Sequence, residues 1–171
     1  MNPILAAGVL IGLLCGAWTF VMGFTGWYKD PVMTNVFFVV ILFEIGGLVW
    51  GLRRTAAQGR GYGGQILAGT MMAILAGVII VLFSLVFTTV VFPDYSAEVE
   101  RGTRAALHRQ GRSDADIAVA VQANAAAATP MAQAMSGFIG TLITGIVASA
   151  MIGLFVRSRP DRILSRTHGS L

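Results

Sequence analysis

Residues 66–92 have the sequence ILAGTMMAILAGVIIVLFSLVFTTVVF, a run of 27 residues without a charged side chain. An α-helix rises about 1.5 Å per residue, so roughly 20 apolar residues cross the ~30 Å hydrocarbon core of a bilayer. The run is therefore long enough to span a membrane with some tilt. A membrane strand is excluded, because the run is too long and does not alternate between apolar and polar residues.

Three further runs of this kind occupy residues 4–27, 32–52 and 131–156, and only the second contains a charge, Glu44. The other nineteen charged residues of the 171-residue chain lie outside the four runs. Charged residues make up 12% of the chain, against about 25% in soluble domains, and the mean hydropathy is +0.75. These values exclude a soluble domain and predict an all-α integral membrane protein, a bundle of four spanning helices.

The first run has no basic residue before it and exceeds the length of a signal peptide, so we expect a retained span. The four spans form one membrane domain, residues 1–157, followed by a basic tail, residues 158–171. The tail and the segment between the second and third spans are rich in arginine, which the positive-inside rule places in the cytoplasm. Both termini are then cytoplasmic. Arginine far outnumbers lysine, and alanine and glycine are abundant, which favours the inner membrane of a bacterium.

The segment 94–128, between the third and fourth spans, is predicted to form a two-helix hairpin outside the membrane. Apolar residues recur at helical spacing on both sides of Gly111, a residue typical of helix ends. Ser113 is placed to cap the second helix, with Asp116 three residues later.

Glu44 is the one ionisable residue inside a predicted span. A charged carboxylate in hydrocarbon costs several kcal/mol, so it must be protonated, paired or exposed to a polar crevice. The functional hypothesis is a proton or cation site, or a ligand contact. The alternative is a neutral acid bonded to a backbone carbonyl or to a hydroxyl such as that of Thr19, Thr70 or Thr144.

Small residues recur at intervals of four on three of the spans, a pattern that lets helix backbones approach closely. One interpretation is packing of the helices within the chain. The other is docking of a partner or a second copy, most readily at Gly8, Gly12 and Gly16 of the first span. The residues assigned to helix packing or partner contact are Gly8, Gly12, Gly16, Gly69, Gly77, Gly145, Ser149 and Gly153.

The net charge of +4 comes from arginines beside apolar runs, which favours anionic lipid headgroups over nucleic acid as the partner. The alternative, which we favour, is that these arginines only set the topology of the chain in the membrane. The lipid-binding candidates are Arg53, Arg54, Arg60, Arg157 and Arg159.

Residues with recognisable catalytic or metal-binding spacing are missing from the sequence. The single Cys15 excludes an internal disulfide, and His108 and His168 stand far apart, so no metal, haem or other cofactor is expected. The glycine-rich stretch 59–64 lacks the Lys-Ser/Thr ending of a phosphate-binding loop. We therefore expect a protein that is not an enzyme.

Three stretches resemble a bacterial family of small four-span membrane proteins, the domain of unknown function 4199. They are Leu52-Arg53-Arg54 with Gly63-Gly64-Gln65-Ile66 and Gly69; Pro93-Asp94-Tyr95; and Gly111 with Ser113-Asp114-Ala115-Asp116-Ile117 and Thr129-Pro130. The resemblance covers most of residues 4–156. The chain departs from it in having no Ser-Phe-Gly after Ile66 and in a hairpin that is less charged. The family implies a four-span fold and no particular activity.

The expected function is that of an accessory or scaffold subunit of a larger membrane complex, for example an energy-transducing one. The subunit would act through its small-residue helix faces and the outer hairpin. One alternative is a small oligomeric transporter of ions or solutes that uses Glu44. Another is a membrane protein that binds a lipid or quinone between its helices. The surroundings of Glu44 discriminate between these hypotheses, because a polar crevice favours transport and a dry interface favours a scaffold.

Overall fold

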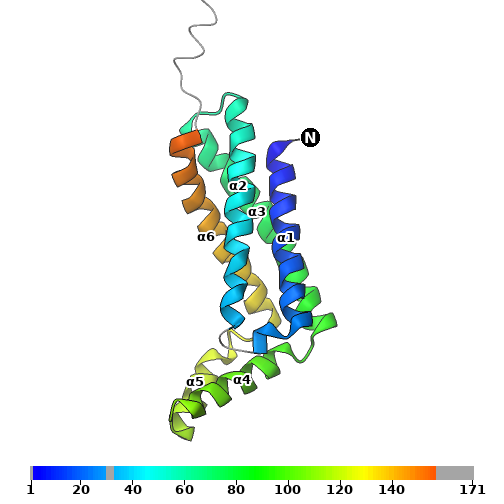
Figure 1. Ribbon diagram of the computed structural model, residues 1–171, viewed down its shortest axis with the longest axis vertical. Coiled ribbons are helices and arrows are strands. Elements are labelled where there is room, and N and C mark those ends of the chain that lie inside the picture. Colours follow the sequence, from blue (N-terminus) through cyan, green and yellow to red (C-terminus); the bar gives the residue numbers. More distant parts are fainter. Residues whose placement is uncertain (1, 30–32, 157–171) are drawn as a thin grey trace, which may run out of the picture.

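The computed structural model describes residues 2–29 and 33–156, and all regular structure within them is helical (Figure 1). The elements in chain order are α1 Pro3–Thr25, η1 Trp27–Lys29, η2 Met33–Phe38, α2 Val39–Ala57, α3 Tyr62–Val86, η3 Phe87–Val91, α4 Tyr95–Arg109, α5 Asp114–Ala125 and α6 Pro130–Val156.

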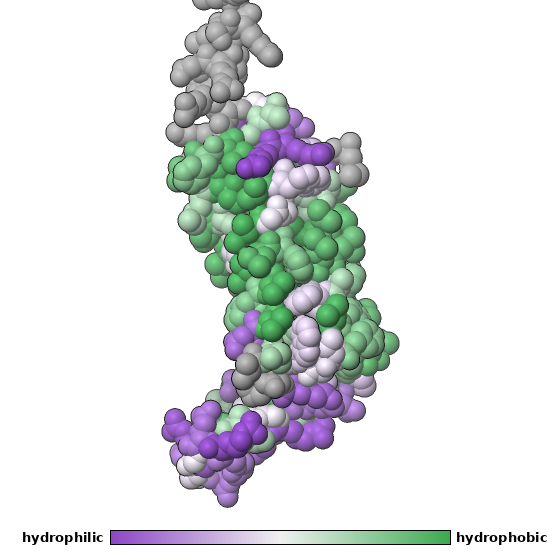
Figure 2. All heavy atoms as spheres, in the orientation of Figure 1, coloured by the Kyte–Doolittle hydropathy of each residue, from purple (hydrophilic) through white to green (hydrophobic). Residues whose placement is uncertain are grey.

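Four continuous helical stretches are long and apolar enough to cross a membrane: Pro3–Thr25, Met33–Ala57, Tyr62–Val91 and Pro130–Val156. Their outer surface carries many exposed large apolar side chains, including Leu42 and Phe155. In Figure 2 a broad hydrophobic band lies between a polar region at one end and a strongly hydrophilic region at the other. The hydrophilic region is the end with α4 and α5 in Figure 1. Exposed apolar surface of this extent is stable in lipid and not in water. The prediction of four membrane-spanning helices is confirmed at this level.

The first spanning helix is delimited by its caps. Asn2 accepts a hydrogen bond from the Ile4 amide, and Pro3 occupies the first helical position. The helix ends at Thr25, two residues before the predicted end at Trp27, because Gly26 adopts φ 71° and reverses the chain. Only glycine takes up this left-handed conformation without strain.

The second spanning helix differs more from its predicted bounds. It begins as the 3₁₀ turn η2 and continues five residues beyond the predicted end at Leu52. Arg53 and Arg54 are thus helical, and both are exposed. Long arginine side chains can reach the polar interface from a helix end, so their charge does not terminate the helix. The Arg54 guanidinium lies 4.4 Å from the centre of the Trp50 ring.

Helix α3 occupies the middle of the spanning region and makes its most extensive contacts with α6 and α1. Glycine allows both approaches. A Cβ added to Gly12 of α1 would lie 2.7 Å from the Ile79 Cβ, and one added to Gly69 would lie 1.7 Å from the Ser149 Oγ of α6. Such distances require glycine, as small-residue packing between membrane helices predicts.

A buried amide joins α2 and α3 near the turn between them. Gln65 is fully buried and faces the last turn of α2. With its nitrogen toward Leu52 and Thr55, the side chain donates to the Leu52 carbonyl (3.3 Å) and to the Thr55 Oγ1 (2.7 Å), and its oxygen accepts from the Ala56 amide (2.9 Å). This side chain therefore ties the first turn of α3 to the last turns of α2.

The segment between α3 and α6 contains the helices α4 and α5, which contact each other through the turn at Gly111. Gly111 has φ 74°, and Ser113 caps α5 by accepting from the Asp116 amide at 3.2 Å, as predicted. Figure 1 shows α4 and α5 at one end of the molecule, with the N-terminus, the α2–α3 turn and the end of α6 at the other. Arg157 and the predicted tail, which contains Arg159, lie outside the described residues.

Candidate functional site

A cavity of about 850 Å³ lies between the spanning helices in the half of the molecule nearer α4 and α5. Its walls come from all four spanning stretches, and α4 and α5 contribute to its outer end. Pockets of 300–1,000 Å³ with mostly apolar walls and a few polar groups are typical of small-molecule sites. The spanning helices are therefore not closely packed along their whole length.

Glu44 lines this cavity from the middle of the second spanning helix. Its side chain is 5% exposed, and its Oε1 has no hydrogen-bond partner among the described residues. The absence of a side chain at Gly145 of α6 makes room for it, since a Cβ there would lie 3.3 Å from the Glu44 Oε1. An unsatisfied buried polar atom of this kind requires an explanation, such as a ligand or water.

The hydroxyl groups considered as partners for Glu44 bond elsewhere or do not reach Oε1. Thr70 donates to the Ile66 carbonyl, and Thr19 donates to the Cys15 carbonyl. Thr19 and Thr144 line the cavity with Glu44, so they give its surface polar character without satisfying Oε1. Cys15 also lines the cavity, and its thiol faces the Val40 carbonyl at 3.7 Å.

One ridge of small residues on α6 borders the cavity instead of a neighbouring helix. Ser136, Gly140 and Thr144 all line it, although their spacing suggests helix packing. A Cβ added to Gly140 would meet nothing within 4 Å. Short side chains on this face leave the volume between α6 and α2 unfilled.

The ionisable groups of the cavity are acidic in character. Among the described lining residues Glu44 and Glu100 are carboxylic acids, and none is Lys, Arg or His. Glu100 lies on α4 at the outer end and is paired with Arg104 at 2.9 Å, with about half of each side chain exposed. Glu44 has no such counter-charge, so it is the distinctive electrostatic feature of the site.

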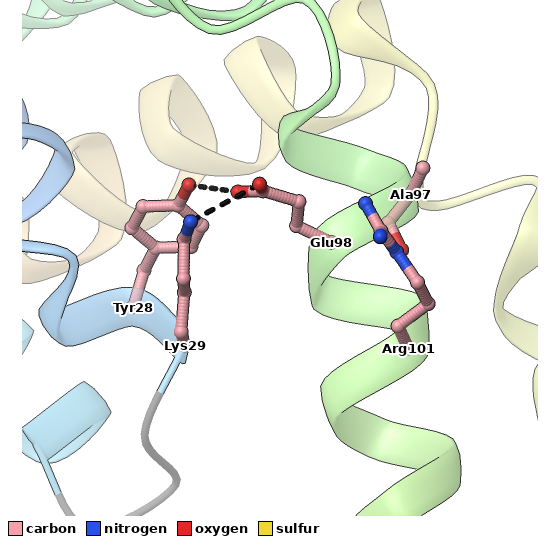
Figure 3. Close-up of polar contacts among 5 residues, drawn as sticks. All are labelled: Tyr28, Lys29, Ala97, Glu98 and Arg101. Atoms are coloured by element: carbon pink, nitrogen blue, oxygen red, sulfur yellow. Dashed lines mark hydrogen bonds and ion pairs between the residues drawn. The ribbon is translucent and has the colours of Figure 1, made fainter.

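Helix α4 is attached over the outer end by a contact that the sequence did not indicate. The Tyr28 hydroxyl donates a hydrogen bond to Glu98 of α4, and the Lys29 Nζ lies 3.1 Å from the same carboxylate (Figure 3). Arg101 turns away along α4, where its Nε donates to the Ala97 carbonyl. We call Tyr28, Lys29 and Glu98 the latch.

The latch shifts the titration of its members in the directions expected for charge-assisted bonds. The hydrogen bond from Tyr28, with that from Lys29, lowers the pKa of Glu98. Partial burial and the bond to Glu98 raise the pKa of Tyr28. The hydrogen bond to Glu98 raises the pKa of Lys29. At neutral pH the carboxylate is therefore ionised and the phenol is protonated.

The other side of α4 is attached to the start of α6. Ser96 donates to the Ala128 carbonyl at 2.8 Å, and the Gln133 amide donates to both groups. Between the two attachments an aromatic layer packs under α4, with Phe87 5.2 Å from Tyr95 and 4.7 Å from Phe92 between ring centres. Phe87 begins the π-helical turn η3, a distortion that is frequent near functional sites.

The remaining predicted site residues lie elsewhere. Gly8, Gly12 and Gly16 face Leu75, Ile79 and Phe83 of α3, so α3 covers the α1 face that was considered for partner docking. Gly77 faces Phe138, and Gly153 faces Gln65 and Tyr62. Arg53 and Arg54 belong to the last turns of α2, and Arg60 lies between α2 and α3. Figure 1 shows the α2–α3 turn at the opposite end of the molecule from α4 and α5. In the described part of the chain no three His, Cys, Asp or Glu residues are grouped for a metal.

These features define a multi-pass α-helical membrane protein with a cavity between its spanning helices whose described lining includes two carboxylic acids and no basic residue. Residues 7–158 match the family described as protein of unknown function (DUF4199), and the chain belongs to this family. The match confirms the resemblance noted in the sequence. Comparison with curated proteins and with solved structures gives no match.

Proposed function

We propose that the protein binds a small lipid-soluble or amphipathic molecule in the cavity between its spanning helices. The observation that carries this proposal is that Glu44 lines an 850 Å³ cavity whose described lining residues include no Lys, Arg or His. An apolar cavity supplies burial energy for a ligand, and a few polar groups fix its orientation. The proposal belongs to the ligand-binding and transport alternatives considered for the sequence.

The apolar part of the ligand would contact Val40 and Ile41 of α2 and Ile80 of α3, which line the cavity near Glu44. The outer part would lie below α4, beside Ser96 and Thr103. The site therefore extends from the middle of the membrane region to the outer segment. This is the arrangement expected for a molecule that partitions between lipid and the interface.

The experiment measures saturable binding of N-phenyl-1-naphthylamine, an uncharged apolar fluorophore, to the protein in phosphatidylcholine nanodiscs. Gly140→Leu fills the cavity from α6, and Gly46→Leu is the matched control, because a Cβ at either position meets nothing within 4 Å and Gly46 does not line the cavity. We expect saturable binding by wild type and Gly46→Leu, and at least tenfold weaker binding by Gly140→Leu. A linear signal equal to that of empty nanodiscs would refute the proposal.

The accessory-subunit role stays a second proposal. Gly46 is exposed on α2 and has open space above it, so a partner helix could approach closely there. Gly46→Leu would then also reduce recovery of a partner under mild detergent, without changing fluorophore binding. If wild type and Gly46→Leu recover the same amount of partner, the subunit role is contradicted.

We also propose that the protein lies in a bacterial inner membrane with both termini in the cytoplasm. Anionic lipid would then bind at Arg53, Arg54 and Arg60. This location is supported by the arginines at the α2–α3 end and by the positive-inside rule.

A further inference from the structure

The ionisable groups of the cavity indicate what kind of molecule it takes. We propose that the ligand is an amphipathic cation, a protonated amine on an apolar body, whose ammonium group bonds to Glu44. This inference rests on the proposed binding function and specifies its substrate class.

The immediate surroundings of Glu44 offer no cation. The cavity is lined on α1 by Cys15 and Thr19 and on α6 by Thr141 and Thr144, and none of these residues is basic. None of them donates a hydrogen bond to Oε1. A carboxylate in such a place is stable only as the neutral acid or beside a positive charge.

A protonated amine supplies what the site lacks. Its charge compensates the carboxylate, and its N–H groups can form charge-assisted hydrogen bonds to the carboxylate where Glu44 lines the cavity. An anionic molecule, such as a fatty acid or a phospholipid phosphate, would bring a second negative charge beside Glu44 and is disfavoured. An uncharged alcohol could donate one hydrogen bond and would leave the charge uncompensated.

The position of Glu44 requires an apolar body on the cation. Glu44 is six residues beyond Phe38, which places it about 9 Å deeper along the helix axis, and both residues line the cavity. A small hydrated ion would lose its water against the apolar walls formed by Val40, Ile41 and Ile80. An alkyl or aryl amine fills this volume with its body and presents its charged end to Glu44.

Glu100 does not offer an equivalent site. Its carboxylate is paired with Arg104 at 2.9 Å and is about half exposed to solvent, where ion pairing contributes little. The preference for a cation should therefore depend on Glu44 and persist in variants that remove a distant acid.

The test is displacement of N-phenyl-1-naphthylamine from wild-type protein in phosphatidylcholine nanodiscs by octylamine, octanol or octanoate. The three competitors share an alkyl chain and differ in charge. Glu44→Gln removes the charge with the same side-chain shape, and Asp94→Asn is the control, because Asp94 is exposed and does not line the cavity. The elution profile in detergent verifies that each variant is folded.

We expect octylamine to displace the probe at least tenfold more effectively than octanol, and octanoate to be the weakest. This preference should disappear in Glu44→Gln and persist in Asp94→Asn. Lowering the pH from 8 to 5 should weaken displacement by octylamine and leave octanol unchanged, because protons compete with the amine for the same carboxylate.

Equal displacement by octylamine and octanol, or a preference that survives Glu44→Gln, would overturn the cation inference and leave the binding function intact. Absence of saturable probe binding to wild type would remove the binding function and the inference together.

Discussion

The hydroxyl of Tyr28 donates a hydrogen bond to the carboxylate of Glu98, which lies 70 residues later in the chain. Tyr28 follows α1, and Glu98 belongs to α4, whose residues line the outer end of the cavity. The bond therefore joins the spanning region to the segment above the cavity. Together with the Ser96–Ala128 contact, it determines how firmly α4 is held.

Removing the Tyr28 hydroxyl should loosen α4 without unfolding the protein. In Tyr28→Phe the ring still packs against Tyr95, whose centre is 4.9 Å away, while the bond to Glu98 is lost. We expect severalfold faster hydrogen exchange in α4 and unchanged exchange in α3, because local opening depends on local contacts. Tyr62→Phe, at the opposite end, is the control. Unchanged exchange in α4 would show that the latch does not hold this helix.

The latch should also make stability depend on pH. Because the folded-state pKa of Glu98 lies below its usual value, ionised Glu98 stabilises the fold above its unfolded-state pKa, about 4.3. This contribution is lost as the pH falls through the lowered pKa. In thermal unfolding we expect the melting temperature of wild type to exceed that of Glu98→Gln at pH 7. This difference in melting temperature should shrink toward pH 3. A difference that stays constant over this range would exclude the linkage.

The close approach of α3 and α6 predicts a compensating pair of substitutions. Gly69→Ala introduces a Cβ into the space of the Ser149 Oγ and should cost about 1–3 kcal/mol, as overpacking does. Ser149→Gly should restore most of this loss when the two are combined. Gly46→Ala, where the added Cβ meets nothing, is the control. Additive effects in a double-mutant cycle would mean that the two positions are not in contact.

The buried amide of Gln65 should contribute to stability at the α2–α3 end. Gln65→Leu leaves the Ala56 amide and the Leu52 carbonyl without this side-chain partner, which should cost about 1–3 kcal/mol. Unfolding in detergent measures the loss, and Gln58→Leu, at an exposed position, is the control. Equal stability of the two variants would contradict a stabilising role for Gln65.

Orientation in the membrane follows from labelling at two positions. Gln58 follows α2 and His108 belongs to α4, and Figure 1 shows the α2–α3 turn and α4 at opposite ends of the molecule. In a Cys15→Ala background, Gln58→Cys should resist an impermeant thiol reagent added to intact cells, and His108→Cys should react. The reverse pattern would invert the orientation, and equal labelling of both would contradict a membrane-spanning chain.

Several local features could be predicted because their causes are local in sequence. The apolar run 66–92 is helical because a membrane requires every backbone group to be bonded within the segment. Gly111 and Ser113 mark the end of α4 and the start of α5 through conformational freedom and side-chain capping. The ends of the helices were predicted less accurately. The second spanning helix continues from the predicted end at Leu52 to Ala57, because an arginine side chain can reach the interface from a helical position.

Only the tertiary structure decided what surrounds Glu44. The sequence alone showed one carboxyl in an apolar run, but periodicity does not reveal whether the ridge with Ser136, Gly140 and Thr144 packs or leaves space. The bond between Tyr28 and Glu98 was equally hidden, since contacts between distant segments depend on how the helices associate. The hydrophobic effect specifies which segments enter lipid, whereas the shape of facing side chains determines where a cavity remains.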